Sequence, residues 1–337
     1  VSRLAAFCTT PGRARCGTGS RIYKNLTPTS FSVLQLLVIC LAMSRVCIGL
    51  PVFNGERYLE GALQSILAQR FEDFELIISD NASSDATEDI CRDFALKDPR
   101  ITYLRNEVNL GAAPNFNRVF ALAKAPLFKW AAHDDLLEPD FLGACVTALE
   151  ADPAAVLAFT SATQIDQHGT FLREYDGGFD RATSDDPRVR FRALIRDEHN
   201  CLPVFGLIRR DLLARTSLIG AYVGSDRVLL VQLGLLGRFA MIPEPLFAHR
   251  EHPGRSTRSI PLRQRAAWFD TRIKDKRVMP YWRFLKEYSS AIFGVELSGN
   301  DRVRCMIELI RWIKTYRRRL LADLGMGRPV VAAQKAT

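Results

Sequence analysis

Two adjacent carboxylates offer the clearest opportunity for chemistry in this sequence. Asp134 and Asp135 lie within the run KWAAHDDLLEP at 129–139, directly after a segment that is typical of a buried strand. Adjacent carboxylates repel each other and rarely serve packing, whereas at a strand end they can hold a divalent cation together with phosphate oxygens. The pair is equally compatible with a solvated loop or a helix cap before Pro139. The pattern alone leaves both interpretations open.

The segments that precede the acidic pair alternate between strand and helix patterns. Apolar runs predict strands at 46–54, 74–79 and 101–106, and a fourth one before the acids. Helical spacing of apolar residues predicts helices at 56–69, 87–98 and 115–125. This alternation predicts an α/β fold with a doubly wound, mostly parallel sheet and helices on both faces. Ligands of such sheets bind beyond the carboxyl ends of the strands, so one rim should gather Asp80, Asn81, Asp134 and Asp135.

Two strings of the sequence resemble the nucleotide-sugar half of family-2 glycosyltransferases, the inverting group with the GT-A fold. They are PVFNGERYLEGALQSILAQRFEDFELIISDNASSDAT and FKWAAHDDLLEPDFL. The resemblance covers residues 45–255 and rests on several separated motifs that agree in order and spacing. It implies a nucleotide-diphosphate sugar donor, Mg²⁺ or Mn²⁺ as cofactor, and transfer to a hydroxyl with inversion.

The resemblance assigns the donor nucleotide to two loops. Pro51, Phe53 and Asn54 occupy the loop after the first strand, which lies against the base and ribose. Asp80 and Asn81 take the place of an acidic pair that receives the N3–H of a pyrimidine. Because the amide of Asn81 is a donor as well as an acceptor, the identity of the base stays open.

The resemblance also gives the acidic pair its roles. Asp134 and Asp135 match acids that contact the ribose and the metal, and Asp135 is the favoured metal ligand. Many relatives carry a further acid two positions before Asp134, where this chain has Ala132.

A candidate base lies in YVGSDRVLLVQLGLL at 222–236, where a Gly-Ser turn precedes an apolar helix. Asp226 is well placed for an N-cap. The resemblance implies that Asp226 deprotonates the acceptor hydroxyl, on the face opposite the leaving diphosphate.

The segment FAHREHPGRSTR at 247–258 resembles an RxH segment that closes over the diphosphate. It implies that Arg250 pairs with phosphate oxygens and that His252 reaches phosphate or metal. A solvated basic loop is the alternative, above all for His249. We interpret His133 as a spacer beside the acids and His168 as part of a turn.

Charge and composition suggest three parts. Residues 1–43 carry five basic residues and no acids, and we interpret them as an N-terminal extension that is disordered or a weak anchor. Residues 44–255 form the predicted catalytic domain, with a donor half at 44–140 and an acceptor half at 141–255. Residues 256–337 form a helical basic region. The excess of Lys and Arg over Asp and Glu is −8 (21 − 29) for 44–249 and +11 (18 − 7) for 250–319.

The basic region suggests a membrane surface. A helix predicted at 301–324 carries Val303, Ile307, Ile310, Ile313 and Leu320 on one stripe. The stripe could pack on the catalytic domain. With Trp282, Phe284 and Trp312 nearby, the helix also suits an anionic membrane. We therefore expect a cytoplasmic enzyme, peripheral on the inner face of the plasma membrane, with a glycan or lipid-linked acceptor.

Other classes of function fit less well. A sugar-phosphate nucleotidyltransferase normally has a Gly-rich basic loop after its first strand, which PVFNGERYL lacks. A non-catalytic sugar-nucleotide-binding relative is disfavoured because Asp135 and Asp226 are retained. The sequence shows no nucleic-acid recognition motif, so we expect no nucleic-acid partner. The eight cysteines form no CxxC pair, which disfavours a zinc site.

Overall fold

The computed structural model describes residues 44–175, 178–197, 199–254, 268–269 and 279–326. The chain divides into two units, Val1–Met43 and Ser44–Thr337. The predicted N-terminal extension, and residues 256–267, 270–278 and 327–337 of the predicted basic region, lie outside the described residues. All that follows concerns the second unit.

Four parallel strands form the first part of the sheet, in the order β3-β2-β1-β4. These strands are β1 (Val46–Val52), β2 (Phe74–Asp80), β3 (Ile101–Arg105) and β4 (Leu127–Trp130). The helices between them are α2 (Glu56–Leu67), α3 (Thr87–Lys97) and α4 (Ala112–Leu122). Each of these elements falls on a segment that the apolar pattern predicts, and the predicted α/β fold is confirmed.

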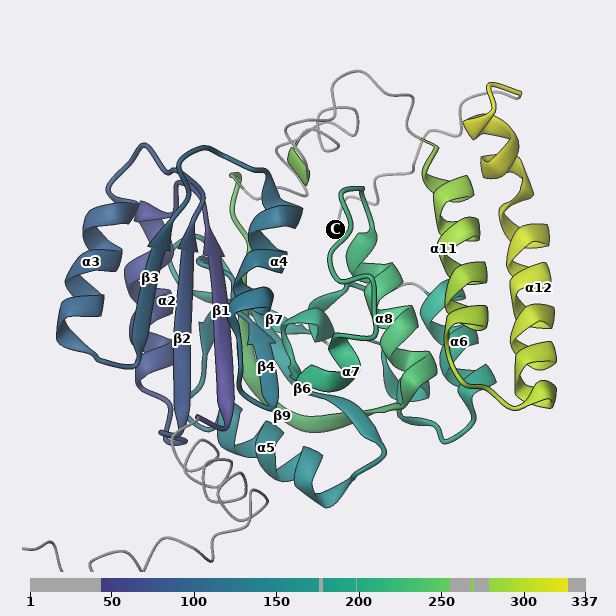
Figure 1. Ribbon diagram of the computed structural model, residues 1–337, viewed down its shortest axis with the longest axis horizontal. Coiled ribbons are helices and arrows are strands. Elements are labelled where there is room, and N and C mark those ends of the chain that lie inside the picture. Colours follow the sequence, from purple (N-terminus) through teal and green to yellow (C-terminus); the bar gives the residue numbers. More distant parts are fainter. Residues whose placement is uncertain (1–43, 176–177, 198, 255–267, 270–278, 327–337) are drawn as a thin grey trace, which may run out of the picture. The chain divides into compact units, whose positions relative to one another are not determined.

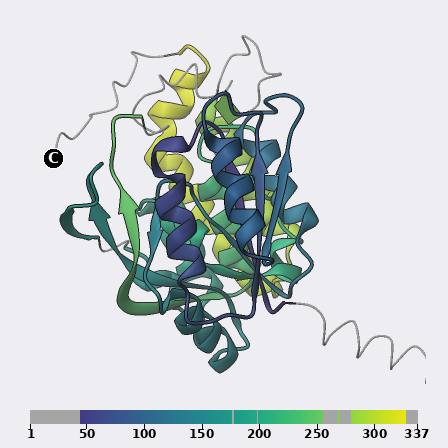
Figure 2. The same cartoon turned by 90° about the vertical axis from the view of Figure 1, so that its left-hand side faces the viewer.

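The two faces of β1 bury different helices. Ile48 and Leu50 belong to the core that contains the apolar face of α2, whereas Cys47 belongs to the core that contains Val119 of α4. Successive side chains of a strand point to opposite faces, so helices cover both sides of this sheet. Figure 2 shows α2 and α3 side by side. A Cβ at Gly49 would lie 2.6 Å from Val119, so glycine allows α4 to approach β1 closely.

The second part of the sheet is mixed. β8 (Leu207–Arg209) is antiparallel to β4 and to β6 (Ala155–Ile165), and β6 is parallel to β9 (Arg238–Arg250). β5 (Leu136–Leu137) and β7 (Phe171–Tyr175) add antiparallel pairs. The accompanying helices are α5 (Phe141–Ala151), α6 (Pro187–Arg196), α7 (Arg210–Leu213) and α8 (Ser225–Leu236), with the 3-10 turns η1 (Asp180–Thr183) and η2 (Leu202–Phe205).

Two C-terminal helices, α11 (Pro280–Gly294) and α12 (Gly299–Asp323), lie side by side (Figure 1). α12 packs on α6, where the fully buried Glu308 accepts hydrogen bonds from Arg188 at 2.9 Å and Arg311 at 2.7 Å. α11 packs on α8. The hairpin therefore shares the core of the α/β domain.

The burial of α12 differs from the predicted stripe. Leu320 is buried, but the exposed members are Val303, Ile307 and Ile310. Packing of the whole stripe on the catalytic domain is therefore wrong. Trp312, assigned from the sequence to a membrane-facing mixture, is buried with its ring centroid 5.5 Å from that of Tyr288. Among the described helices, none has the length and hydropathy to cross a bilayer.

Candidate active site

A cavity of about 920 Å³ opens beyond the carboxyl ends of the parallel strands. Its acidic side comes from the loops after β1 and β4 and from the end of β9. Its helix side comes from residues 199–205 and the first turn of α8. The predicted site residues that line the cavity are Pro51, Phe53, Asn54, Asn81, Asp134, Asp135, Asp226 and His252. Asp80 and Arg250 are not among the described residues that line it.

Each acid of the central pair is hydrogen-bonded to a histidine. Asp134 Oδ2 lies 3.0 Å from His252 Nε2, and Asp135 Oδ1 lies 3.1 Å from His249 Nδ1. The backbone N–H of Arg250 also donates to Asp135 Oδ1, at 2.9 Å. His249 is therefore buried on a strand, and the interpretation of it as part of a solvated loop is wrong.

The surroundings of Asp134 favour its charged form. Burial alone would raise the pKa of this carboxyl, but the hydrogen bond from His252 and the neighbouring imidazole of His133 lower the pKa to about 2. Asp134 is thus an anion throughout the physiological pH range and is available to bind cations.

Arg250 fixes the acidic loop. Its guanidinium donates to the backbone carbonyls of Asp134 at 2.8 Å and Asp166 at 3.1 Å, and lies 4.9 Å from the ring centroid of Tyr58. The expected diphosphate contact would require this side chain to reach the cavity, where the structure does not place it. Among the described lining residues, Arg57 is the only arginine or lysine, and no sequence signal distinguished it.

The loop after β1 is built around Asn54. Its φ of 51° lies in the left-handed region, which asparagine tolerates better than most residues. Asn54 Oδ1 accepts from the N–H of Ser84 at 2.9 Å, and its own N–H donates to Ser83 Oγ at 2.9 Å. These bonds tie the first loop to the loop after β2 and leave Phe53 exposed at the cavity.

Asp80 and Asn81 lie at the end of β2 but differ in placement. Asp80 is fully buried and accepts from Tyr103 Oη at 2.9 Å and from Arg105 at 2.5 Å. The side chain of Asn81 accepts from Asn106 Nδ2 at 2.9 Å. Both side chains are thus engaged within the protein, and Asn81 alone of the two lines the cavity.

Asp226 lies in the first turn of α8, at the positive end of the helix dipole. The N-cap is Gly224, with φ 82°, rather than Asp226. Asp226 Oδ1 accepts the N–H of Arg227 at 2.9 Å, and the thiol of Cys201, which also lines the cavity, is hydrogen-bonded to the Asp226 side chain. The alternative of an N-cap is therefore wrong, and the carboxylate lines the cavity.

Two lining groups beside Asp226 have no hydrogen-bond partner. They are Ser225 Oγ and His199 Nδ1, both buried atoms. Burial, with the nearby charge of Arg227, lowers the pKa of His199 to about 4. At neutral pH the ring is uncharged; its Nε2–H donates to Leu194 O at 3.1 Å, which leaves Nδ1 as an acceptor. Sequence reasoning missed His199 because only packing brings it to Asp226, whereas the position of Ser225 directly before Asp226 was the signal that could have found Ser225.

The acidic side fits a divalent cation. His249 Nε2 is a buried atom that lacks a partner, while Nδ1 is hydrogen-bonded to the Asp135 carboxylate. No group of three ligands converges among the described residues. Mg²⁺ usually takes one or two carboxylates and completes its shell with water and substrate phosphates. The donor set therefore suits such an ion.

Comparison with known proteins agrees on one family. The model of glycosyl transferase family 2 matches residues 47–216. An uncharacterised glycosyltransferase of Methanocaldococcus jannaschii is 30% identical over 36% of this chain and 42% of its own length. A GalNAc(5)-diNAcBac-PP-undecaprenol beta-1,3-glucosyltransferase of Campylobacter jejuni is 26% identical over 57% of this chain and 60% of its own. The chain spans less than half the length of the first four curated relatives that it matches.

Solved structures share the fold. S. aureus TarS 1-349 in complex with UDP-GlcNAc has a TM-score of 0.62 at 13% identity, over 83% of this chain and 80% of TarS. The mannosyltransferase PcManGT of Pyrobaculum calidifontis, in complex with GDP-Man and Mn²⁺, has a TM-score of 0.50 at 18% identity, over 84% and 74%.

Proposed function

This chain belongs to glycosyl transferase family 2, and we propose that it is an inverting enzyme that transfers a sugar from a nucleotide-diphosphate donor to a hydroxyl of a glycan or lipid-linked acceptor. The observation that carries the proposal is the two-sided cavity. Its acidic side holds Asp134 and Asp135, and its helix side presents Asp226. Proteins of similar fold are solved with UDP-GlcNAc and with GDP-Man.

The nucleotide would lie along the loops after β1 and β2. Phe53 offers an exposed ring for contact with the base, and Asn54 and Asn81 line the same part of the cavity. Asp80 would act indirectly, because its carboxylate holds Tyr103 and Arg105 in place through hydrogen bonds. The diphosphate would meet His252 and Arg57, with Arg250 keeping the acidic loop in place.

Asp134 and Asp135 would hold Mg²⁺ or Mn²⁺, which supplies a positive charge against the leaving diphosphate. Asp226 would take the proton from the acceptor hydroxyl as its oxygen attacks the anomeric carbon. The bond from that carbon to the diphosphate oxygen breaks, and inversion follows because nucleophile and leaving group occupy opposite faces.

The helix side would receive the acceptor. Ser225 Oγ and His199 Nδ1 can bond hydroxyls next to the attacking one, because both lack partners in the protein. The Campylobacter jejuni relative is named for a PP-undecaprenol compound, which supports a lipid-linked acceptor.

A donor screen tests the proposal. The full chain is heated with UDP-sugars and GDP-sugars, with and without Mn²⁺, because a ligand that binds only the folded state raises the melting temperature. The expected result is Mn²⁺-dependent stabilisation by one donor, followed by release of its nucleotide diphosphate. NMR of the product should show an inverted anomeric centre. Retention of configuration, or stabilisation by none of the donors, would contradict the proposal.

A further inference from the structure

The open end of the C-terminal hairpin carries a group of exposed apolar side chains. We name it the hairpin tip, and it consists of Met279, Trp282, Leu321, Leu324 and Met326, each between 38% and 56% exposed. The start of α11 and the end of α12 are joined there, since the N–H of Tyr281 donates to Asp323 at 2.7 Å and Trp282 Nε1 donates to Leu320 O at 3.0 Å. The tip is therefore a built surface and not a frayed end.

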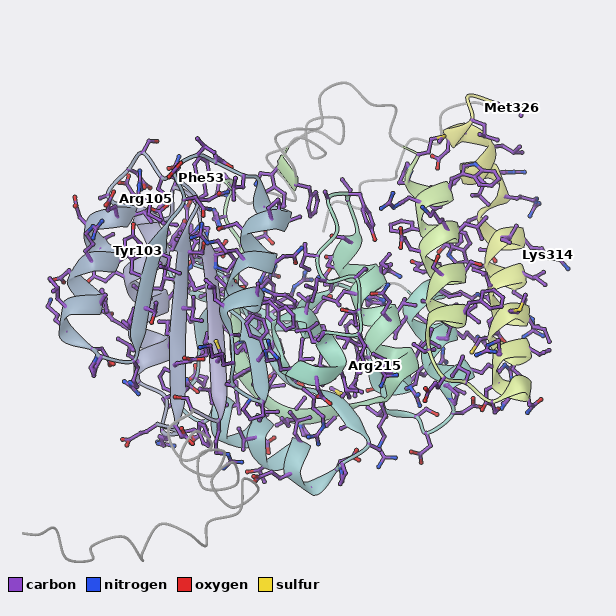
Figure 3. All side chains as sticks on the ribbon, viewed as in Figure 1. Phe53, Tyr103, Arg105, Arg215, Lys314 and Met326 are labelled. Atoms are coloured by element: carbon purple, nitrogen blue, oxygen red, sulfur yellow. The ribbon has the colours of Figure 1, made fainter. Side chains whose placement is uncertain are left out.

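The hairpin tip lies next to the helix side of the cavity. The Arg283 guanidinium lies 4.5 Å from the ring centroid of Tyr222, and a Cβ on Gly224 would lie 2.5 Å from the ring of Phe284. Tyr222 and Gly224 form the turn that opens α8 and precedes Asp226. In Figure 3, Met326 and the cavity residue Phe53 both lie on the upper side of the molecule, toward its two ends. The contacts of Arg283 and Phe284 connect the start of α11 to the turn that precedes Asp226.

Positive charge accompanies the apolar side chains. Lys314, Arg317 and Arg318 are exposed on α12 and form no ion pair with a described residue. The nearby carboxylate of Asp323 is occupied by backbone N–H groups. A second copy of this chain would bring like charges together. An anionic surface would neutralise them, and exposed tryptophan is typical of membrane interfaces.

We propose that the hairpin tip docks this enzyme on an anionic lipid bilayer and turns the cavity toward acceptors held in that bilayer. The apolar side chains would enter the interface, and Lys314, Arg317 and Arg318 would remain at the headgroups. The inference rests on the proposed function for the nature of the acceptor. Vesicle binding itself requires no donor, so it can fail while transfer to soluble acceptors persists, and the reverse also holds.

Sedimentation of the full chain with vesicles tests the proposal. The vesicles consist of phosphatidylcholine with or without phosphatidylglycerol. We expect binding to the anionic vesicles alone, and release as salt rises. Arg317→Gln with Arg318→Gln should lower the partition coefficient by about tenfold or more. Leu321→Gln with Leu324→Gln should lower it by a similar factor, because apolar burial and charge act together.

A matched control lies on the same helix. Ile307 and Ile310 are 43% and 50% exposed, like Leu321 and Leu324 at 46% and 39%, but lie in the other half of α12. Ile307→Gln with Ile310→Gln should leave vesicle binding unchanged. An equal loss in this control, equal binding to neutral vesicles, or no binding by the full chain would overturn the proposal. So would a dimer in solution that the Leu321→Gln, Leu324→Gln variant abolishes.

Discussion

The two sides of the cavity differ in how completely their polar groups are used. On the acidic side, Asp134 and Asp135 are each bonded to a histidine, and Arg250 locks the loop between them. On the helix side, Asp226 is hydrogen-bonded to the N–H of Arg227 and the thiol of Cys201, while Ser225 Oγ and His199 Nδ1 have no hydrogen-bond partner. Buried polar atoms without partners are costly, so such atoms on a cavity wall indicate a ligand.

The difference suggests a division of labour. In the proposed function, an acidic side held by its own hydrogen bonds is pre-organised for the donor diphosphate and its cation. A helix side with open bonding capacity would gain its partners from the acceptor. Three substitutions, in decreasing order of their expected effect on substrate binding or transfer, test this contrast, and a fourth concerns stability alone.

Asp226→Asn should abolish the base and leave the donor site intact. We expect transfer to fall by about 10²-fold or more, the usual scale for loss of a general base, with unchanged donor affinity by calorimetry. Asp211→Asn, which changes an exposed acid on α7, is the control. Near-normal turnover by a folded Asp226→Asn enzyme would show that Asp226 is not the general base.

Asp135→Asn and Asp134→Asn should act on the acidic side. Mn²⁺-dependent affinity for the nucleotide sugar should fall by about tenfold or more, because a neutral amide binds cations weakly. In the absence of metal, Asp134→Asn should also lower the melting temperature, because the lowered pKa of Asp134 means that the folded protein favours the charged carboxylate. Asp140→Asn is the control, because that acid is 55% exposed and paired with Arg70. An unchanged Mn²⁺ dependence in both variants would contradict the assigned cation site.

His199→Leu and Ser225→Ala should affect the acceptor alone. Each variant loses one hydrogen bond to a hydroxyl, worth about 1 kcal/mol, so the acceptor KM should rise by about fivefold with the donor KM unchanged. His168→Leu, in an exposed turn, is the control. If the donor KM rises instead, the two sides of the cavity do not divide the substrates as described.

Lys129→Met should change stability and leave both sides of the cavity unaltered. Lys129 is fully buried in β4, and burial lowers its pKa from 10.5 to about 7. Between these values the unfolded chain holds a proton that the folded chain lacks, so this group makes the free energy of unfolding rise with pH across that window. The full rise is roughly 5 kcal/mol.

Denaturant unfolding at several pH values, compared between the wild type and Lys129→Met, isolates this contribution from that of other groups. The difference between the two proteins should shrink as pH rises from 7 to 10.5. Near pH 7 the free energy of unfolding should be higher for Lys129→Met than for the wild type. Part of this increase is offset because the carbonyl of Phe205 loses the hydrogen bond from Lys129. A difference that is constant with pH would mean that the buried amine stays charged.

Local apolar periodicity predicts strands β1 to β4 and helices α2 to α4. Because a parallel sheet gathers residues at its carboxyl ends, Asn81, Asp134 and Asp135 could be assigned to one rim. Asn54 and Asp226 were assigned from the family resemblance of their motifs.

Tertiary packing determines which of these groups face the cavity. Asp80 and Arg250 have the residue types of ligands, but their neighbours Tyr103 and Asp166 draw them into the protein. His199 joins Asp226 because α6 and α8 pack together, which no local pattern encodes. The apolar spacing along α12 did not predict which of its residues are buried. A helix can carry more than one apolar stripe, and the elements that pack against it determine which stripe is covered.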